Sequence, residues 1–137
     1  MIPDLGPNGY LPAGVHLASE QEVLQRFGRG NNRRLGLGKG LSQVLALARA
    51  VGAARVVVDG SFVTAKAEPA DIDGLVIVPR GFKPFGEEIA KVRKARDLYD
   101  CDLVVLPVQE GTLIGRRIEF FSTDRDGIHK GLVEVTL

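Results

Sequence analysis

Two aspartates separated by one residue follow a Gly-Ser pair in the middle of the chain. Asp71 and Asp73 come about ten residues after Gly60 and Ser61. The apolar run Val56–Val58 before the glycine predicts a buried strand, and a second apolar run begins between the aspartates. Side chains alternate along a strand, so both carboxylates point to the same face and require a cation. The Gly-Ser pair at a strand exit can offer backbone N–H groups to a phosphate.

These residues also carry a resemblance to a known family. A Gly-Ser pair followed after about ten residues by Asp-x-Asp at the start of a strand resembles the signature of the DNA polymerase β-like nucleotidyltransferase superfamily, in particular its small bacterial members. In that superfamily a third carboxylate comes from a later strand, and Asp102 stands at the start of the next apolar run. The resemblance covers roughly residues 40–108, and the ending 120–131 is similar to a small branch of the superfamily.

The resemblance implies a fold, an activity and a set of site residues. The fold is α/β (α+β), a single domain with a mixed β-sheet flanked by helices. The activity is metal-dependent transfer of a nucleoside monophosphate from an NTP such as ATP to a hydroxyl of a protein or RNA. Two Mg²⁺ ions, or Mn²⁺, suit hard carboxylate ligands. The implied metal-binding and catalytic residues are Asp71, Asp73 and Asp102, and the implied phosphate-binding residues are Gly60, Ser61 and Lys66.

The sequence departs from the superfamily pattern at several positions. Thr64 and Ala70 stand roughly where small bacterial members usually carry a basic residue and a serine, and Gly74 follows the second aspartate inside a predicted strand. Lys66 is the candidate to replace the base. Two alternatives therefore stay open: an inactive nucleotide-binding or partner-binding module of the same fold, and a metal-dependent nuclease or phosphohydrolase. The Gly-Ser pair disfavours hydrolysis, which needs no triphosphate cradle.

The resemblance also suggests partners. Many minimal members of the superfamily act in toxin–antitoxin pairs, modifying a partner such as a HEPN-domain ribonuclease or modifying transfer RNA. A domain this short has no separate nucleobase-binding domain, so a second copy of the chain or a partner protein could complete the pocket.

Composition and charge set broad limits. The 137 residues with 45% hydrophobic content fit one domain with a single core. A net charge of +1 gives no global basic field for coating nucleic acid. The single Cys101 cannot form an intramolecular disulfide, and the N-terminus lacks signal-peptide features, so we expect a cytoplasmic protein. The most apolar stretch is too short and too often interrupted by arginine to span a membrane.

Periodicity predicts the elements around the motif. The first 17 residues hold three prolines and three glycines, which predicts an extended arm over residues 1–18 before a domain over 19–137. Ser19 and Glu22 have capping-box spacing for a helix that ends at Gly28. Further helices are expected from Leu41 to about Arg49 and over residues 87–99. Alternation over residues 133–137 predicts a strand, which we expect to pair with residues 117–121 through an Asp126-Gly127 turn.

Other features have a structural interpretation beside a functional one. Residues 36–40 resemble a phosphate loop, but no strand precedes them and the serine or threonine of a P-loop is missing. The sequence leaves open whether two sets of polar residues bind phosphates or are solvated. These are Arg26, Arg29, Arg33 and Arg34 in a predicted basic loop, and Arg125, His129 and Lys130 near the terminal turn.

Overall fold

Five strands form one mixed sheet in a computed structural model that describes residues 1–82 and 86–137. The spatial order is β1-β5-β2-β3-β4. β1 is parallel to β5 and β3 to β4, whereas β2 is antiparallel to both of its neighbours. The strands are β1 (Val15–Ala18), β2 (Arg55–Asp59), β3 (Ile72–Val78), β4 (Cys101–Pro107) and β5 (Leu132–Val135). The expected mixed sheet with flanking helices is therefore confirmed.

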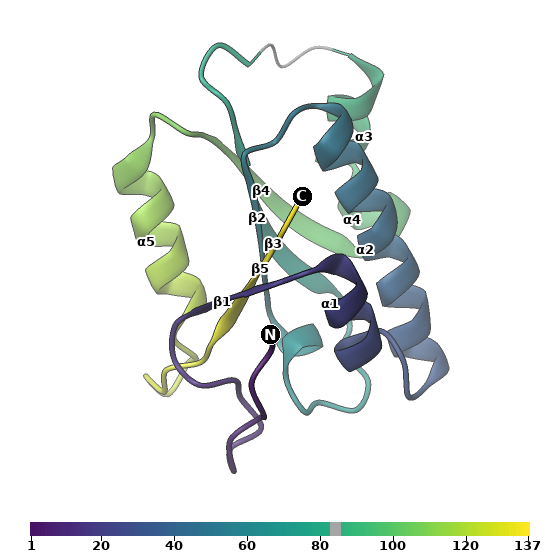
Figure 1. Cartoon of the computed structure of the whole chain (residues 1–137), viewed down its shortest axis with the longest axis vertical. Helices are drawn as coiled ribbons and strands as arrows, with labels where there is room; N and C mark the ends of the chain where they lie inside the picture. Colours follow the sequence, from purple (N-terminus) through teal and green to yellow (C-terminus); the bar gives the residue numbers. More distant parts are fainter. Residues whose placement is uncertain (83–85) are drawn as a thin grey trace.

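The helices divide unequally between the two faces of the sheet. Figure 1 shows α5 alone on one side and the other four helices on the opposite side. The helices are α1 (Glu20–Phe27), α2 (Asn32–Ala50), α3 (Glu87–Arg93), α4 (Ala95–Tyr99) and α5 (Gly111–Phe121), and a 3-10 turn, η1 (Ser61–Val63), follows β2. The helix expected over residues 87–99 is thus two short helices that meet at Lys94. Together they connect the parallel strands β3 and β4.

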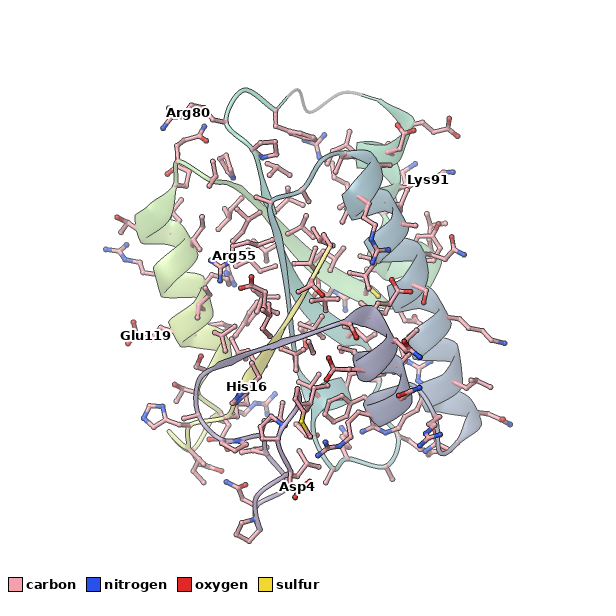
Figure 2. All side chains as sticks on the ribbon, viewed as in Figure 1. Asp4, His16, Arg55, Arg80, Lys91 and Glu119 are labelled. Atoms are coloured by element: carbon pink, nitrogen blue, oxygen red, sulfur yellow. The ribbon has the colours of Figure 1, made fainter. Side chains whose placement is uncertain are left out.

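Alternation along the strands separates two apolar clusters. Val56, Val58 and Ile72 pack with the helices α1 and α2, whereas Val57 and Leu75 pack on the side of α5. Arg55 shares that second side, where its Nε lies 2.9 Å from Glu134 Oε1 (Figure 2). By the same alternation, side chains at odd positions of β2 and β3 and at even positions of β4 face α5. That face therefore receives all the acids of the Asp-x-Asp and Asp102 segments.

The first 18 residues differ from the predicted arm. Ser19 does cap α1, with the reciprocal capping box to Glu22. Ahead of it, however, β1 joins the sheet beside β5, and Ile2 and Leu11 are buried in the main core. The prediction of an arm without a packed element is therefore wrong. A four-residue strand is too short to show a recognisable alternation of apolar and polar residues. Its partner strand lies more than a hundred residues away in the sequence.

The basic loop predicted after α1 is also wrong. Asn31 caps α2, accepting a hydrogen bond from the Arg34 amide, so the helix begins nine residues before Leu41. Residues 36–40 are therefore helical and form no phosphate loop. A Cβ at Gly40 would lie 2.5 Å from the Tyr99 carbonyl oxygen, so this glycine is what lets α4 pack closely on α2.

The end of the chain pairs differently from the prediction. Residues 117–121 belong to α5, and β5 lies between β1 and β2. The turn at Asp126-Gly127 does form, closed by a bridge between Thr123 and His129. Local alternation located the strand, but its partners are distant segments that no local pattern indicates.

Within residues 1–82 and 86–137, none of the helices has the length and apolar character needed to cross a membrane.

Candidate functional site

Three aspartates form a row across adjacent strands on the α5 face. Asp59 on β2 lies opposite Asp73 on β3 in the antiparallel register, and Asp73 lies opposite Asp102 on β4 in the parallel register. Asp71 precedes β3 by one residue and is close enough to Asp73 to affect its ionisation. The structure therefore brings together the acids that the sequence indicated, and it adds Asp59. The available signal for Asp59 was an acid directly between an apolar strand and Gly60.

Burial differs along this row. Asp59 is 4% exposed, Asp71 and Asp73 are partly buried, and Asp102 is exposed. The Asp102 carboxylate lies 4.0 Å from Arg96 Nη1. Asp59 faces Lys130, whose Nζ is 3.5 Å from Asp59 Oδ1. That oxygen accepts no hydrogen bond. Asp59 is thus a buried carboxylate whose Oδ1 has an ion-pair partner but no hydrogen bond, and Asp102 is the solvent-facing end of the row.

Mutual repulsion is concentrated at Asp73. Burial first, and then the charges of Asp71, Asp59 and Asp102, raise the pKa of Asp73 to about 6, while the charge of Lys130 lowers it. Burial also raises the pKa of Asp59, against the opposing effects of the Gly60 amide and Lys130. A cation among these oxygens would relieve the repulsion, because an opposite charge favours the ionised carboxylates.

Gly60 is the residue that joins the acids to the turn after β2. Its φ is 84°, in the region that favours glycine, and a Cβ there would lie 2.4 Å from Asp73 Oδ2. Ser61 begins η1 directly afterwards. The Thr64 hydroxyl donates to the Ser61 carbonyl at 2.7 Å. Thr64 therefore stabilises the turn.

Arg34 holds the segment after the Gly-Ser turn in place. Its guanidinium is buried and donates to the carbonyl oxygens of Phe62 at 2.7 Å, Thr64 at 2.8 Å and Lys66 at 2.5 Å, and also to that of Phe27. Burial lowers the pKa of this guanidinium. Arg34 is therefore a buried clamp on the loop and is unavailable to phosphates.

Two other members of the predicted basic loop also bind the protein. Arg26 donates to the Ile2 and Pro3 carbonyls, and Arg33 donates to the Pro69 carbonyl at 2.9 Å. Arg29 is exposed. The cluster of arginines is thus dispersed into separate structural contacts.

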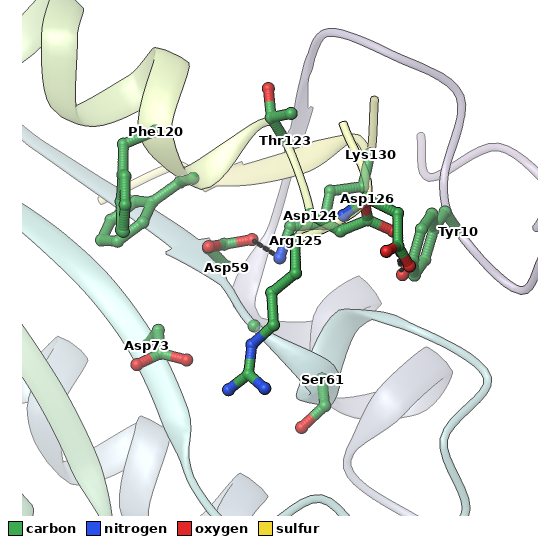
Figure 3. Close-up of a pocket in the computed structure, with 12 residues that line it drawn as sticks. Tyr10, Asp59, Ser61, Asp73, Phe120, Thr123, Asp124, Arg125, Asp126 and Lys130 are labelled. Atoms are coloured by element: carbon green, nitrogen blue, oxygen red, sulfur yellow. Dashed lines mark hydrogen bonds and ion pairs between the residues drawn. The ribbon is translucent and has the colours of Figure 1, made fainter. Parts of the chain in front are cut away.

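Two adjoining cavities open beside the Gly-Ser turn. The larger, of about 540 Å³, contains Asp59 and Asp73 (Figure 3). The smaller, of about 320 Å³, contains Thr64 and Lys66. The residues common to both are Tyr10, Gly60, Ser61 and Lys130. Asp71 and Asp102 line neither cavity, although they belong to the same cluster of acids.

The terminal turn forms one wall of the larger cavity. The Tyr10 hydroxyl donates to Asp124 Oδ2 at 2.8 Å, and Asp124 Oδ1 accepts from the amides of Asp126 and Ile128. Figure 3 shows the Arg125 guanidinium extending between Asp73 and Ser61. Arg125 and Lys130 therefore face the cavity. His129 is exposed and does not line it.

The donor chemistry of the site suits a hard divalent cation. Its groups are carboxylate oxygens, one of them buried without a hydrogen-bond partner. Within the described residues, no three side chains of the His, Cys, Asp and Glu types converge closely enough to form a metal site as they stand. Binding would therefore require Asp71, which is partly buried, and Asp102, which is exposed, to move toward Asp73.

Comparison with known proteins identifies a family. A family of unknown function (DUF6932) matches residues 3–136, and the chain therefore belongs to that family. No curated protein and no solved structure matches the chain significantly.

Proposed function

We propose that this DUF6932 protein is a metal-dependent nucleotidyltransferase that transfers a nucleoside monophosphate from an NTP to a hydroxyl of a protein or RNA acceptor. The observation that carries the proposal is the contact between Gly60 and Asp73. A turn suited to a phosphate and an acid suited to a metal ion are so close that a single Cβ would not fit between them. Nucleotidyl transfer needs this proximity, because a metal ion held by the carboxylates would have to stabilise the charge of the triphosphate.

The roles of the residues follow from burial and position. Asp71, Asp73 and Asp102 would hold two Mg²⁺ or Mn²⁺ ions, which when bound activate the acceptor hydroxyl and neutralise the leaving pyrophosphate. Asp102 is the most exposed acid of the row and would orient the incoming hydroxyl or take its proton.

The phosphate end of the donor would lie in the smaller cavity. The Ser61 amide and hydroxyl are hydrogen-bond donors there, and Lys66 supplies positive charge. Arg125 would approach the nucleotide from the opposite wall of the larger cavity. These side chains come from separate segments, so their common orientation toward one space supports a ligand of high negative charge.

The proposal also specifies the chemical class of the acceptor and the kinds of partner protein. A protein hydroxyl and an RNA terminal hydroxyl both fit an open cavity with one exposed acid beside it. A HEPN-type partner in a toxin–antitoxin pair, or a second copy of this chain, would supply the remaining surface for the nucleobase. Light scattering of the purified protein, with and without the product of the neighbouring gene, distinguishes a homo-oligomer from a hetero-complex.

A nucleotide-binding module without turnover is the second candidate. It is favoured by the positions of Asp71 and Asp102, which belong to the row of acids but line neither cavity. In such a module Asp73 and the Gly-Ser turn would still bind a metal–nucleotide complex.

Label transfer tests the proposal directly. The purified chain is incubated with each α-³²P-labelled NTP, Mg²⁺ or Mn²⁺, and a cell extract, beside an Asp71→Ala/Asp73→Ala variant. Asp97→Asn is the matched control, because Asp97 is an exposed acid on α4, outside the site. We expect label on a protein or RNA band with the wild type and the control only. Binding of nucleotide without label transfer in any extract would favour the module, and release of nucleotides or phosphate without transfer would favour a hydrolase.

A further inference from the structure

We infer that Asp59 is a fourth metal-binding carboxylate and that Lys130 is its exchangeable counter-ion, which turns to the triphosphate when a divalent cation binds. This inference rests on the proposed nucleotide site and adds to it two residues with linked roles. Neither residue belongs to the Asp-x-Asp or Gly-Ser segments.

The first step is the unsatisfied oxygen of Asp59. Asp59 ends β2 after three buried valines, its side chain is 5% exposed, and Oδ1 accepts no hydrogen bond. A buried carboxylate kept only for the fold normally has its oxygens satisfied, because an unpaired buried polar atom costs free energy. Asp59 lines the larger cavity beside Asp73 (Figure 3). Asp59 Oδ1 faces Lys130 across this cavity, and the Asp59 carboxylate lies on the strand position opposite Asp73, where a cation would relieve the repulsion on Asp73.

The second step is the loose pairing with Lys130. The Nζ–Oδ1 distance is 3.5 Å, longer than the roughly 2.7–2.9 Å of a charge-assisted hydrogen bond. The ammonium thus balances the Asp59 charge without satisfying the oxygen. A divalent ion would do both, because it binds carboxylate oxygens directly.

The third step is the position of Lys130 between the two cavities. Its backbone amide is fixed by a hydrogen bond to the Ser122 carbonyl at 2.8 Å, while its side chain lines both cavities. Rotation of the flexible side chain alone can therefore carry the ammonium from Asp59 toward Ser61 and Lys66, where the phosphates would lie. A divalent ion beside Asp59 would repel the ammonium, and a triphosphate would attract it.

The charges of the site are consistent with this exchange. Asp59 and Asp102 lie opposite Asp73 on the neighbouring strands, Asp71 lies two residues before it, and the Lys130 ammonium is 3.5 Å from Asp59. One ammonium leaves most of that negative charge uncompensated. Two divalent ions would compensate it and would free Lys130 to balance part of the triphosphate.

Manganese binding to the full chain without nucleotide tests the inference. The Mn²⁺ affinity is measured by calorimetry at pH 8 for the wild type, Lys130→Met and Asp59→Asn. We expect Lys130→Met to bind Mn²⁺ several-fold more tightly, because a competing cation is removed. We expect Asp59→Asn to bind at least about tenfold more weakly, because a ligand is lost. A merely structural ion pair would weaken Mn²⁺ binding in both variants.

A second titration follows the other half of the exchange. In saturating Mn²⁺, a non-hydrolysable α,β-methylene triphosphate should bind several-fold more weakly to Lys130→Met. Lys66→Met is the matched control, which should weaken triphosphate binding and leave Mn²⁺ binding alone. If Asp59→Asn fails to fold in a thermal melt, the sign of the Lys130→Met change decides.

The outcomes separate this inference from the proposed function. Unchanged or weaker Mn²⁺ binding by Lys130→Met would overturn the inference even in a protein that transfers label. Tighter Mn²⁺ binding by Lys130→Met and weaker Mn²⁺ binding by Asp59→Asn, in a protein that transfers no label, would support the metal role of Asp59 and contradict the proposed transferase activity. Absence of Mn²⁺ binding by the wild type would overturn both.

Discussion

The Cβ of any residue other than glycine at position 60 would lie 2.4 Å from Asp73 Oδ2. The backbone of the turn after β2 is therefore in contact with the central acid of the row. Gly60 makes this approach with a φ of 84°. An alanine at this position would have a strained backbone, because L-residues with a Cβ disfavour that φ. One residue thus determines both the shape of the turn and the position of the Asp73 carboxylate, which makes it a sensitive place to test the site.

Gly60→Ala should destabilise the protein and abolish Mn²⁺ binding. The backbone strain costs about 1–3 kcal/mol, and the clash displaces the Asp73 carboxylate. Urea unfolding and Mn²⁺ calorimetry measure the two effects. Gly52→Ala is the matched control, since Gly52 has a φ of 73° and open space around its Cβ. The control should lose stability and keep Mn²⁺ binding. Retained Mn²⁺ affinity in Gly60→Ala would contradict a metal site at Asp73.

Asp73→Asn should stabilise the metal-free protein at pH 8. Asp73 has its pKa raised to about 6 in the folded state from 3.8, so below pH 3.8 both states are protonated and no penalty exists. Between about pH 4 and 6 the folded state holds the proton more tightly, so stability falls as pH rises and remains reduced above 6. The penalty is between about 1 and 3 kcal/mol after allowance for solvent screening.

The comparison is made by urea unfolding of the wild type and Asp73→Asn in EDTA across pH 4–8. The stability advantage of the variant should be largest at pH 8 and should shrink toward pH 4. Added Mg²⁺ should stabilise the wild type and not the variant, because a ligand that binds only the folded state raises its stability. If the difference in stability between the variant and the wild type does not change with pH, the pKa of Asp73 is not raised in the folded protein.

Arg34→Lys should cost several kcal/mol of stability. Four carbonyl oxygens accept hydrogen bonds from the guanidinium, and a lysine ammonium lacks the planar fork that reaches them all. Each hydrogen bond to a charged group contributes about 1.5–3 kcal/mol, so the loss of two of the four amounts to several kcal/mol. Arg29→Lys, at an exposed position, should change stability by less than about 0.5 kcal/mol. Equal effects of both substitutions on the urea midpoint would contradict the clamp.

The sequence predicted the elements with strong local patterns. The valines of β2, the apolar run of β3 and the capping box at Ser19 each lie within a few residues, so period and spacing located them. The sequence did not predict β1 or the strands that pair with β5, because pairing between distant segments leaves no local signal. The sequence did not predict the structural role of Arg34 for a related reason. A buried arginine is recognised only when the carbonyl groups around it are known.

The acids of the site divide in the same way. Spacing indicates Asp71 and Asp73, whereas Asp102 is indicated by the resemblance to the superfamily, which implies a third carboxylate at the start of a later apolar run. Asp59 was missed because an acid at the end of a strand is ordinarily a solvated turn residue. Its significance depends on the register that puts it opposite Asp73 and on the Lys130 side chain that arrives from the other end of the chain.

The Tyr10 hydroxyl should matter for nucleotide binding through the terminal turn. Its hydrogen bond to Asp124 raises the pKa of Tyr10 and joins the N-terminal segment to the turn that carries Arg125. Tyr10→Phe removes that bond, worth about 1 kcal/mol of stability, and leaves Arg125 less constrained over the cavity. We expect several-fold weaker binding of the α,β-methylene triphosphate in Mn²⁺, with Mn²⁺ binding alone unchanged.

Two further variants identify the cause of that change. Arg125→Gln should reproduce the loss of triphosphate affinity, and combining it with Tyr10→Phe should add little, because both changes act on one contact. Tyr99→Phe is the control, since Tyr99 packs on the opposite side of the sheet, against the main core. If the losses from Tyr10→Phe and Arg125→Gln are additive, Tyr10 contacts the nucleotide itself and the turn is not the intermediary.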